Sequence, residues 1–211
     1  MHGDEFVHGL LCERMGARQV VVGSDFRFGV GGKADVALLQ KVGAQLGFGV
    51  EVVEPVLVDG ERVSSSLIRA ALANRDLERA ARLLGRPYAM HGKVIRGEGL
   101  GRKLGFPTAN MRVHRRVTPL DGIFAVRVRG IGARALPGVA SLGTRPTVGG
   151  GEVLLEAHLF DFDADLYGRW LAVEFVQRLR EERKFESLDA MVVQMHIDAG
   201  QARAALGLPA S

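Results

Sequence analysis

The stretch Gly97-Glu-Gly-Leu-Gly-Arg-Lys-Leu-Gly-Phe-Pro-Thr-Ala-Asn110 holds the most chemically informative residues of the chain. Glycine lacks a Cβ and tolerates positive φ, so a bound anion can come close to the backbone N–H groups of such a loop. Arginine and lysine within the loop would neutralise phosphate charge. The pattern therefore predicts an ATP- or phosphate-binding segment with these binding residues: Gly97, Gly99, Gly101, Gly105, Arg102 and Lys103.

Two oxygen-bearing side chains close the same stretch. Thr108 offers a hydroxyl and Asn110 an amide carbonyl, and hard oxygen donors of this kind suit Mg²⁺. The glycine spacing matches neither a Walker loop nor a Rossmann fingerprint. From spacing alone, a simple turn between two strands is an equally good interpretation.

Composition limits the classes of protein that this chain fits. Its 211 residues are 47% hydrophobic and 25% charged, which suits one large soluble domain or two small ones. No apolar run approaches the roughly 18 residues needed to cross a bilayer, so we expect no membrane partner. The single cysteine, Cys12, cannot form an internal disulfide and fits a reducing cytoplasm, the expected location. The sequence leaves the oligomeric state open.

The net charge of +4 comes from scattered arginines and not from one basic block. Such a balance is compatible with nucleic acid and equally with a phosphorylated small molecule. Aromatic residues make up only 6% of the chain and do not interleave with a basic stripe. We therefore expect no nucleic-acid partner.

The first 84 residues alternate between helical and strand patterns. Helices are predicted at 5–17, 34–46, 65–73 and 77–84, and strands at 19–22, 48–53 and 55–58. This order predicts an α/β layer with a mostly parallel sheet, although the segment is short for a free-standing domain of that class. Gly85-Arg-Pro87 interrupts the pattern, so we place the boundary there, with domains 1–84 and 85–211.

Short strands separated by turns dominate the second part. They are predicted at 89–96, 123–128, 136–142, 153–160 and 170–179, and this pattern is typical of a small antiparallel barrel or sandwich. A closing helix at 188–206 has Met191, Met195, either Ile197 or Asp198, and Ala202 at helical spacing, which indicates a core-facing stripe.

The run from Gly101 to Asn110 closely resembles the signature of riboflavin kinases, with its Pro-Thr-Ala-Asn tetrad. Further blocks of the same family follow in order, namely Pro119-Leu-Asp-Gly-Ile-Phe124, Ser141-Leu-Gly-Thr-Arg-Pro-Thr147, Glu156-Ala-His158 and Arg180-Glu-Glu-Arg-Lys-Phe185. Ser141 stands where the family usually has asparagine. From about Leu83 onward, the chain thus resembles the bacterial bifunctional riboflavin kinase/FAD synthetase family.

The resemblance implies transfer of the ATP γ-phosphoryl group to the 5′-hydroxyl of riboflavin, giving FMN. It implies that Thr108 and Asn110 hold Mg²⁺ and the phosphates, and that Glu156 is the catalytic base for the hydroxyl proton. It also implies flavin contacts by Arg145, Arg180 and Phe185. The residues alone leave another interpretation of Glu156 open, in which it pairs with His158 or an arginine and only stabilises the barrel.

The first part of the chain resembles part of the family's FMN adenylyltransferase domain, in Val20-Val-Val-Gly-Ser-Asp-Phe-Arg-Phe-Gly29 and Val63-Ser-Ser-Ser-Leu-Ile-Arg69. The resemblance implies that Ser64, Ser65, Ser66 and Arg69 belong to a site for ATP phosphates, for which a serine-capped helix N-terminus is chemically apt. The implied fold is an incomplete Rossmann-like nucleotidyltransferase domain followed by a small antiparallel β-barrel with a C-terminal helix.

A phosphate-binding His-x-Gly-His loop of that domain is missing, since no two of the six histidines are three residues apart. We therefore expect an N-terminally truncated family member with a vestigial adenylyltransferase site and little or no formation of FAD. The alternative from another class is a non-catalytic barrel that binds flavin or nucleic acid. A pure binder has no need of a phosphate loop, a magnesium pair and a carboxylate together, so the sequence favours the enzyme.

Overall fold

The computed structural model describes residues 2–97, 99–113, 118–145 and 152–209, with the backbone alone at 144, 145 and 152. The chain divides into two compact units, Met1–Val63 and Ser64–Ser211. We describe each unit by itself.

The first unit is built on two parallel strands, β1 (Gln19–Gly23) and β4 (Gly49–Val53), in which Val21 pairs with Glu51. The segment α1 (Gly3–Glu5) continues into the π-helical η1 (Phe6–Arg14), and α2 (Val36–Leu46) connects the two strands. One apolar cluster joins η1, α2 and the residue before β4. It includes Val7 of η1, Leu39 of α2 and Phe48. This helix and strand order agrees with the predicted α/β layer.

Short elements complete the first unit. They are β2 (Arg27–Phe28), η2 (Val30–Gly32), β3 (Ala34–Asp35), β5 (Leu57–Val58) and β6 (Glu61–Arg62). β2 pairs with β3, and β5 pairs with β6 around the turn at Asp59 and Gly60 that the sequence predicts. Both residues of this turn have positive φ.

A helical hairpin opens the second unit, formed by α3 (Ser65–Ala73) and α4 (Leu77–Leu84). Ser64 caps α3 by accepting the N–H of Leu67 at 3.2 Å, and Asp76 caps α4 by accepting that of Arg79 at 2.9 Å. α4 ends at Gly85, whose φ of 68° suits glycine. By its contacts the hairpin groups with the barrel. The domain boundary at 84/85 stays a prediction.

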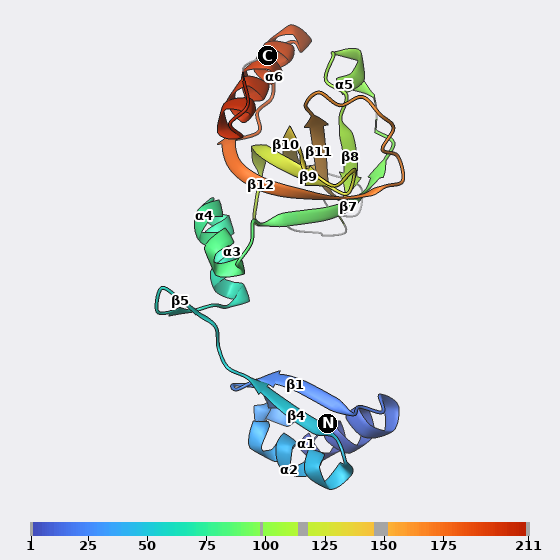
Figure 1. The fold of residues 1–211 in the computed structure, drawn as a ribbon, viewed down its shortest axis with the longest axis vertical. Helices are drawn as coiled ribbons and strands as arrows, with labels where there is room; N and C mark the ends of the chain where they lie inside the picture. The colour runs from blue at the N-terminus through green and yellow to red at the C-terminus, as the bar shows by residue number, and fades with distance from the viewer. Residues whose placement is uncertain (1, 98, 114–117, 146–151, 210–211) are drawn as a thin grey trace. The chain divides into compact units, whose positions relative to one another are not determined.

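Six strands of the described chain close into an antiparallel barrel in the order β10-β11-β8-β7-β12-β9 (Figure 1). They are β7 (Ala89–Ile95), β8 (Ala109–Arg112), β9 (Gly122–Arg129), β10 (Leu136–Arg145), β11 (Glu152–Leu159) and β12 (Trp170–Arg180). The barrel prediction is therefore confirmed. Strand β8 and the single turn α5 (Leu100–Lys103) of this unit were not predicted, because α5 lies within the stretch interpreted as a loop and β8 begins in it.

The core of the barrel follows from strand alternation. On β9, Phe124, Val126 and Val128 are fully buried, whereas Arg127 and Arg129 between and beyond them are exposed. Phe124 meets Phe175 of β12 edge to face, with ring centroids 5.0 Å apart. The strands therefore direct alternate side chains into a closed apolar interior.

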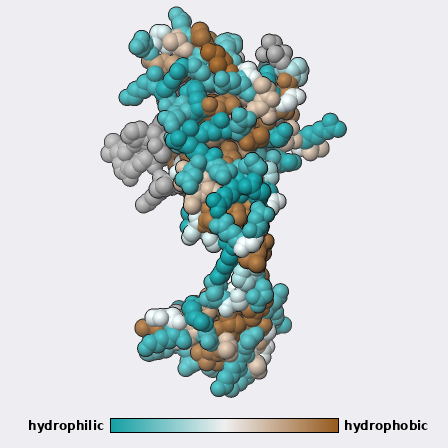
Figure 2. Space-filling model, turned by 90° about the vertical axis from the view of Figure 1, so that its left-hand side faces the viewer, coloured by the Kyte–Doolittle hydropathy of each residue, from teal (hydrophilic) through white to brown (hydrophobic). Residues whose placement is uncertain are grey.

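The last helix, α6 (Leu188–Ala205), contacts β9, β10 and β12. Ser187 caps it by accepting the N–H of Ala190 at 3.1 Å. Ala202 of α6 is fully buried against Ala125 and Phe160. Figure 2 shows hydrophilic surface interrupted by apolar patches, and Val193 and Ile197 of α6 are among the exposed apolar residues. Within the described residues, no helix is long and apolar enough to cross a membrane.

Candidate active site

The glycine-rich stretch joins β7 to β8 and packs closely on the Pro-Thr-Ala-Asn segment. Gly99 (φ 74°) precedes the short helix α5, and Gly105 (φ 83°) follows it. A Cβ on Gly97 would come within 2.6 to 2.7 Å of the Asn110 amide group. A Cβ on Gly101 would lie closer to the Phe106 carbonyl oxygen than van der Waals contact allows. Glycine is thus required here for close packing as well as for turn geometry.

A cavity of about 250 Å³ lies beside this loop, and we call it the glycine-loop cavity. Residues from α5, β8, β11 and α6 line it, namely Gly99, Leu100, Gly101, Leu104, Thr108, Asn110, Glu156, Met191 and Met195. Arg102 lies elsewhere, in a depression with Pro107, Asp163 and Tyr167 that also reaches Thr108. Lys103 is exposed. The phosphate role of these cations stays a prediction.

A second cavity of about 530 Å³ opens between the barrel and the segment that follows β12. We call it the Phe185 cavity, and its lining includes Ile123, Ser141, Glu156, Arg180, Glu182 and Phe185. Four residues line both cavities: Thr108, Glu156, Met191 and Met195. The two cavities therefore adjoin at one hydroxyl and one carboxylate.

Strand register brings the predicted residues together. Glu156 of β11 pairs with Asn110 of β8 on one side and with Ser141 of β10 on the other. The Asn110 amide donates to both the carbonyl oxygen and the Oγ1 of Thr108, each at 3.3 Å. Glu156 is partly buried. Thr108 and Asn110 are neighbours in the sequence and Glu156 is far from both, yet the fold brings all three together, with Thr108 and Glu156 at the junction of the two cavities.

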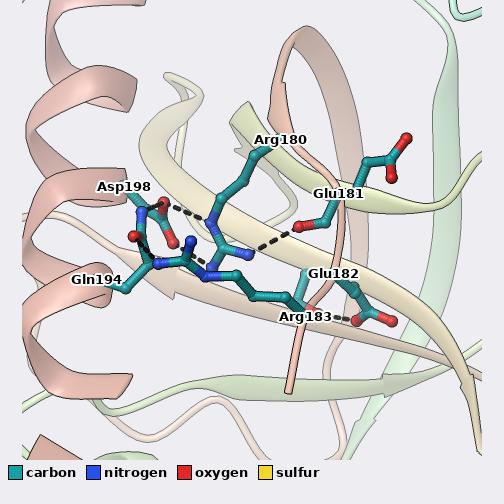
Figure 3. A network of polar contacts seen from close by, with 7 residues as sticks. Arg180, Glu181, Glu182, Arg183, Gln194 and Asp198 are labelled. Atoms are coloured by element: carbon teal, nitrogen blue, oxygen red, sulfur yellow. Dashed lines mark hydrogen bonds and ion pairs between the residues drawn. The ribbon is translucent and has the colours of Figure 1, made fainter. Parts of the chain in front are cut away.

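A buried ion pair supports the wall of the Phe185 cavity (Figure 3). Arg180 donates from Nε and Nη2 to the Asp198 carboxylate at 2.8 and 2.6 Å, and Asp198 is only 3% exposed. Gln194 donates to the same carboxylate at 2.8 Å. The Arg180 Nη1 donates to the carbonyl oxygen of Glu181 at 2.8 Å. Arg180 therefore ties the end of β12 and the next residue to α6.

Phe185 completes this wall. The guanidinium carbons of Arg180 and Arg183 lie 5.7 and 5.0 Å from the centre of its ring. Arg183 also hydrogen bonds to Gln194. Arg180 and Phe185, which the sequence predicts as flavin contacts, both line this cavity. Their contact with flavin stays a prediction. The side chain of Arg145, the third predicted flavin contact, lies outside the described residues.

The Phe185 cavity contains a second carboxylate that sequence reasoning missed. Ser141 Oγ donates to Glu182 Oε1 at 2.7 Å. A side chain on Gly143 would collide with the Glu182 carboxylate, so glycine leaves room for it. The signal was present in the Arg-x-Glu pattern that begins at Arg180, but only the fold places it opposite Ser141.

The predicted adenylyltransferase residues lie at the start of α3. Ser64 is used as the helix cap, and Ser65, Ser66 and Arg69 are exposed. In the first unit, Arg62 donates to Asp25 at 2.6 Å, and this hydrogen bond holds the pKa of the Asp25 carboxyl below its usual value. A phosphate-binding role for the serine segment stays a prediction.

Comparison with protein families gives two matches along the chain. Residues 84–206 match the riboflavin kinase family, and residues 1–67 match the FAD synthetase family. The first match spans the barrel and α6, and the second spans the first unit and the beginning of α3. Each coincides with one of the two regions in which the sequence shows its family blocks.

Individual relatives agree with these matches. The bifunctional riboflavin kinase/FMN adenylyltransferase of Escherichia coli K12 is 44% identical over 203 residues, which is 96% of this chain and 65% of the relative. The protein of that name from Pseudomonas fluorescens is 47% identical over 201 residues, 95% of this chain and 64% of the relative. The chain thus spans slightly under two thirds of the length of these relatives.

Among solved structures, a macrolide-efflux protein from Streptococcus pneumoniae matches with a TM-score of 0.70 and 33% identity, over 94% of this chain and 64% of that protein. Its name describes an activity unlike that of the curated relatives. The match therefore supports the fold and not an activity.

Proposed function

The chain belongs to the riboflavin kinase family, and from this membership we propose that it transfers the γ-phosphoryl group of ATP to the 5′-hydroxyl of riboflavin, giving FMN. One observation carries the proposal: Thr108 and Glu156 line both cavities. A phosphate donor in one cavity and a hydroxyl acceptor in the other would meet at these two side chains. In-line phosphoryl transfer requires such an arrangement of donor and acceptor.

The two cavities suit different substrates. The glycine-loop cavity presents backbone at Gly99 and Gly101 next to the Thr108 hydroxyl, which favours phosphate oxygens. The Phe185 cavity offers about 530 Å³ and combines Phe185, Ile123 and Val139 with a few polar groups. A large, mostly apolar cavity with few polar groups suits a planar ring system such as the isoalloxazine of riboflavin.

The donor set at the junction fits magnesium. Thr108 Oγ1 and the Asn110 amide oxygen are hard, uncharged donors, and Asn110 is held beside Thr108 by the two hydrogen bonds from its nitrogen. Mg²⁺ usually combines a few protein oxygens with substrate phosphates. Thr108 and Asn110 would therefore hold an ion that arrives with ATP, and when bound it would neutralise charge on the phosphates.

Glu156 is the proposed general base. It lies between Asn110 and Ser141 in the strand register, at the junction of the cavities. From there its carboxylate would accept the proton of the ribityl 5′-hydroxyl while the hydroxyl oxygen bonds to the γ-phosphorus and the bond to ADP breaks. Because phosphoryl transfer depends mostly on positioning and charge stabilisation, the metal-side oxygens should contribute more than the base.

The deciding experiment is a chromatographic assay of riboflavin, ATP and Mg²⁺ with this chain, in which FMN and FAD are both followed. We expect FMN to accumulate, and to stop accumulating when EDTA removes Mg²⁺. Little or no FAD stays the prediction for the same sample. Folded protein that produces no FMN would reject the kinase and favour a flavin-binding barrel. Salt-sensitive binding of nucleic acid without turnover would favour the basic binding module.

A further inference from the structure

A hydrogen bond connects the strand that carries Glu156 with the segment that carries Thr108. The Nδ1 of His158 lies 2.9 Å from the carbonyl oxygen of Pro107, the residue before Thr108. A carbonyl oxygen can only accept, so Nδ1 carries the hydrogen and donates it. This bond is a candidate device for fixing the position of Thr108.

The bond lies where the backbone ladder between β8 and β11 ends. Asn110 pairs with Glu156 and Ala109 with Ala157. One further step would pair Thr108 with His158, but β8 begins at Ala109. The hydrogen bond from the imidazole therefore connects the two segments just beyond the last backbone pair. Thr108 is thereby held next to the sheet by a side chain and remains available to both cavities.

Aromatic neighbours fix the orientation of the imidazole. The rings of Phe106 and Phe160 approach that of His158 edge to face, with centroids 5.1 and 5.9 Å away. Phe106 is 5% and Phe160 4% exposed, so both rings belong to the packed interior. Rotation of the imidazole toward another acceptor would disturb this packing, which keeps Nδ1 directed at Pro107.

The same segment is held from its other side by the glycine loop. The Phe106 N–H donates to the carbonyl oxygen of Gly101 at 2.8 Å. Phe106 to Thr108 is thus fixed by the loop at one end and by His158 at the other. On β11, His158 and Glu156 are two residues apart and both line the Phe185 cavity, as alternation along a strand requires.

We propose that His158 is a positioning residue, which sets the place of Thr108 for magnesium-bound nucleotide by donating its Nδ1 hydrogen to the Pro107 carbonyl. The proposal rests on the proposed kinase function. It separates the two strand neighbours: Glu156 acts on the acceptor hydroxyl, whereas His158 acts through the backbone on the nucleotide side. Loss of the bond should therefore weaken binding of MgATP.

Three substitutions separate hydrogen bonding from packing. His158→Phe keeps an aromatic ring and removes the donor. His158→Asn removes the ring but places an amide N–H close to the position of Nδ1. His158→Gln also lacks the ring, and its amide nitrogen corresponds to the position of Nε2. If donation to Pro107 is the role, Asn rescues function, whereas Phe and Gln do not.

The measurements are KM for MgATP, KM for riboflavin, the Kd of MgADP by calorimetry and the melting temperature. We expect His158→Phe and His158→Gln to raise the KM for MgATP and the Kd of MgADP about three- to tenfold, the range for one lost hydrogen bond. His158→Asn should stay within about twofold of the wild type in both quantities. Because His158 also lines the Phe185 cavity, the KM for riboflavin should follow the loss of the ring, alike in the Asn and Gln variants, and not the position of the donor.

Each other outcome rejects the proposal. If Phe retains and Asn loses nucleotide affinity, His158 serves only packing. If Asn and Gln behave alike, the position of the donor is irrelevant, and this pair decides the matter even if the Phe variant fails to fold. A wild type that makes no FMN rejects the kinase function itself, whereas an active wild type with an unaffected Phe variant rejects only the role of His158.

Discussion

The glycine-loop cavity and the Phe185 cavity share Thr108 and Glu156 but are built by different means. The first is built on the glycine loop, where glycines permit a turn at Gly99 and close packing at Gly101, and side chains from β8, β11 and α6 complete its lining. The second is formed by side chains from barrel strands and from the segment after β12, which the pair Arg180–Asp198 ties to α6. The shape of the first cavity therefore depends on glycines, which have no side chain. The shape of the second depends on hydrogen bonds and ring contacts between particular side chains.

This contrast predicts how substitutions should divide between the two substrates. Changes near the glycine loop should alter the KM for ATP, because backbone N–H groups and hard oxygens recognise phosphates. Changes at the Phe185 wall should alter the KM for riboflavin and the stability of the fold. Only changes at the shared residues Thr108 and Glu156 should lower kcat, the rate of reaction when both substrates are bound.

The largest effect is expected from the double substitution Thr108→Ala and Asn110→Ala. It removes both oxygen donors proposed for Mg²⁺ and so removes charge stabilisation of the transferring phosphoryl group. We expect kcat/KM for ATP to fall about a thousandfold or more, since one such group typically contributes a hundred- to a thousandfold. Steady-state kinetics at several Mg²⁺ concentrations would show it. Binding of riboflavin serves as the control. A rise in the Kd of riboflavin as large as the loss of kcat/KM for ATP would contradict the division of effects between the two cavities.

Glu156→Gln should have the next largest effect. The amide keeps the size of the side chain but cannot accept the hydroxyl proton, so kcat should fall about a hundredfold, at the low end for general bases. Glu182→Gln is the matched control, because Glu182 is another carboxylate of the same cavity, lies outside the glycine-loop cavity and is hydrogen bonded to Ser141. An equal loss of kcat in both variants, measured by rapid quench, would mean that Glu156 is not the specific base.

The sequence predicts the barrel well because its strands alternate strongly. The sequence predicts a strand over Ile123-Phe-Ala-Val-Arg-Val128, and β9 spans Gly122–Arg129. Strand β8 escaped prediction because its four residues begin just after Pro107 and carry no clear alternation. Its place in the barrel is decided by pairing with β7 and β11, which is non-local information.

The residues of the candidate site were also predicted only in part. Thr108, Asn110 and Glu156 were identified from motifs, and the register of β8 and β11 brings them together. The partner of Arg180 was not predicted. The helical spacing predicts Ile197 or Asp198 on the core-facing stripe between Met195 and Ala202, but it neither chooses between the two nor indicates Arg180, 18 positions earlier, as the partner of Asp198. Only the packing of α6 on the barrel reveals that it is buried.

Asp198→Ala tests how far the Phe185 wall depends on its ion pair. Arg180, 19% exposed in its side chain, would lose its only buried carboxylate among the described residues. We expect unfolding to require about 3 kcal/mol less free energy, the low end for a broken buried pair, and the KM for riboflavin to rise. Asp161→Ala is a control, since its pair with Arg203 has a 75% exposed carboxylate. Denaturant melts that show equal losses, or a rise confined to the KM for ATP, would contradict the prediction.

The smallest effect concerns Arg75, at the turn between α3 and α4. Its Nη2 lies 2.9 Å from Glu181 Oε1, but the two side chains are 49% and 64% exposed. Arg75→Ala should therefore lower the free energy of unfolding by only about 0.5 kcal/mol, less at high salt, with unchanged kinetics for both substrates.

Arg75→Gly is the matched variant, because the φ of 65° at this position favours glycine and the relieved strain should offset the lost ion pair. Arg75 lies between the two family matches, 1–67 and 84–206. A loss above about 1.5 kcal/mol in the alanine variant, with a raised KM for riboflavin, would exceed the value of an exposed pair. The helical hairpin would then be a working part of the Phe185 wall, and the predicted boundary at 84/85 would have to move toward Ser64.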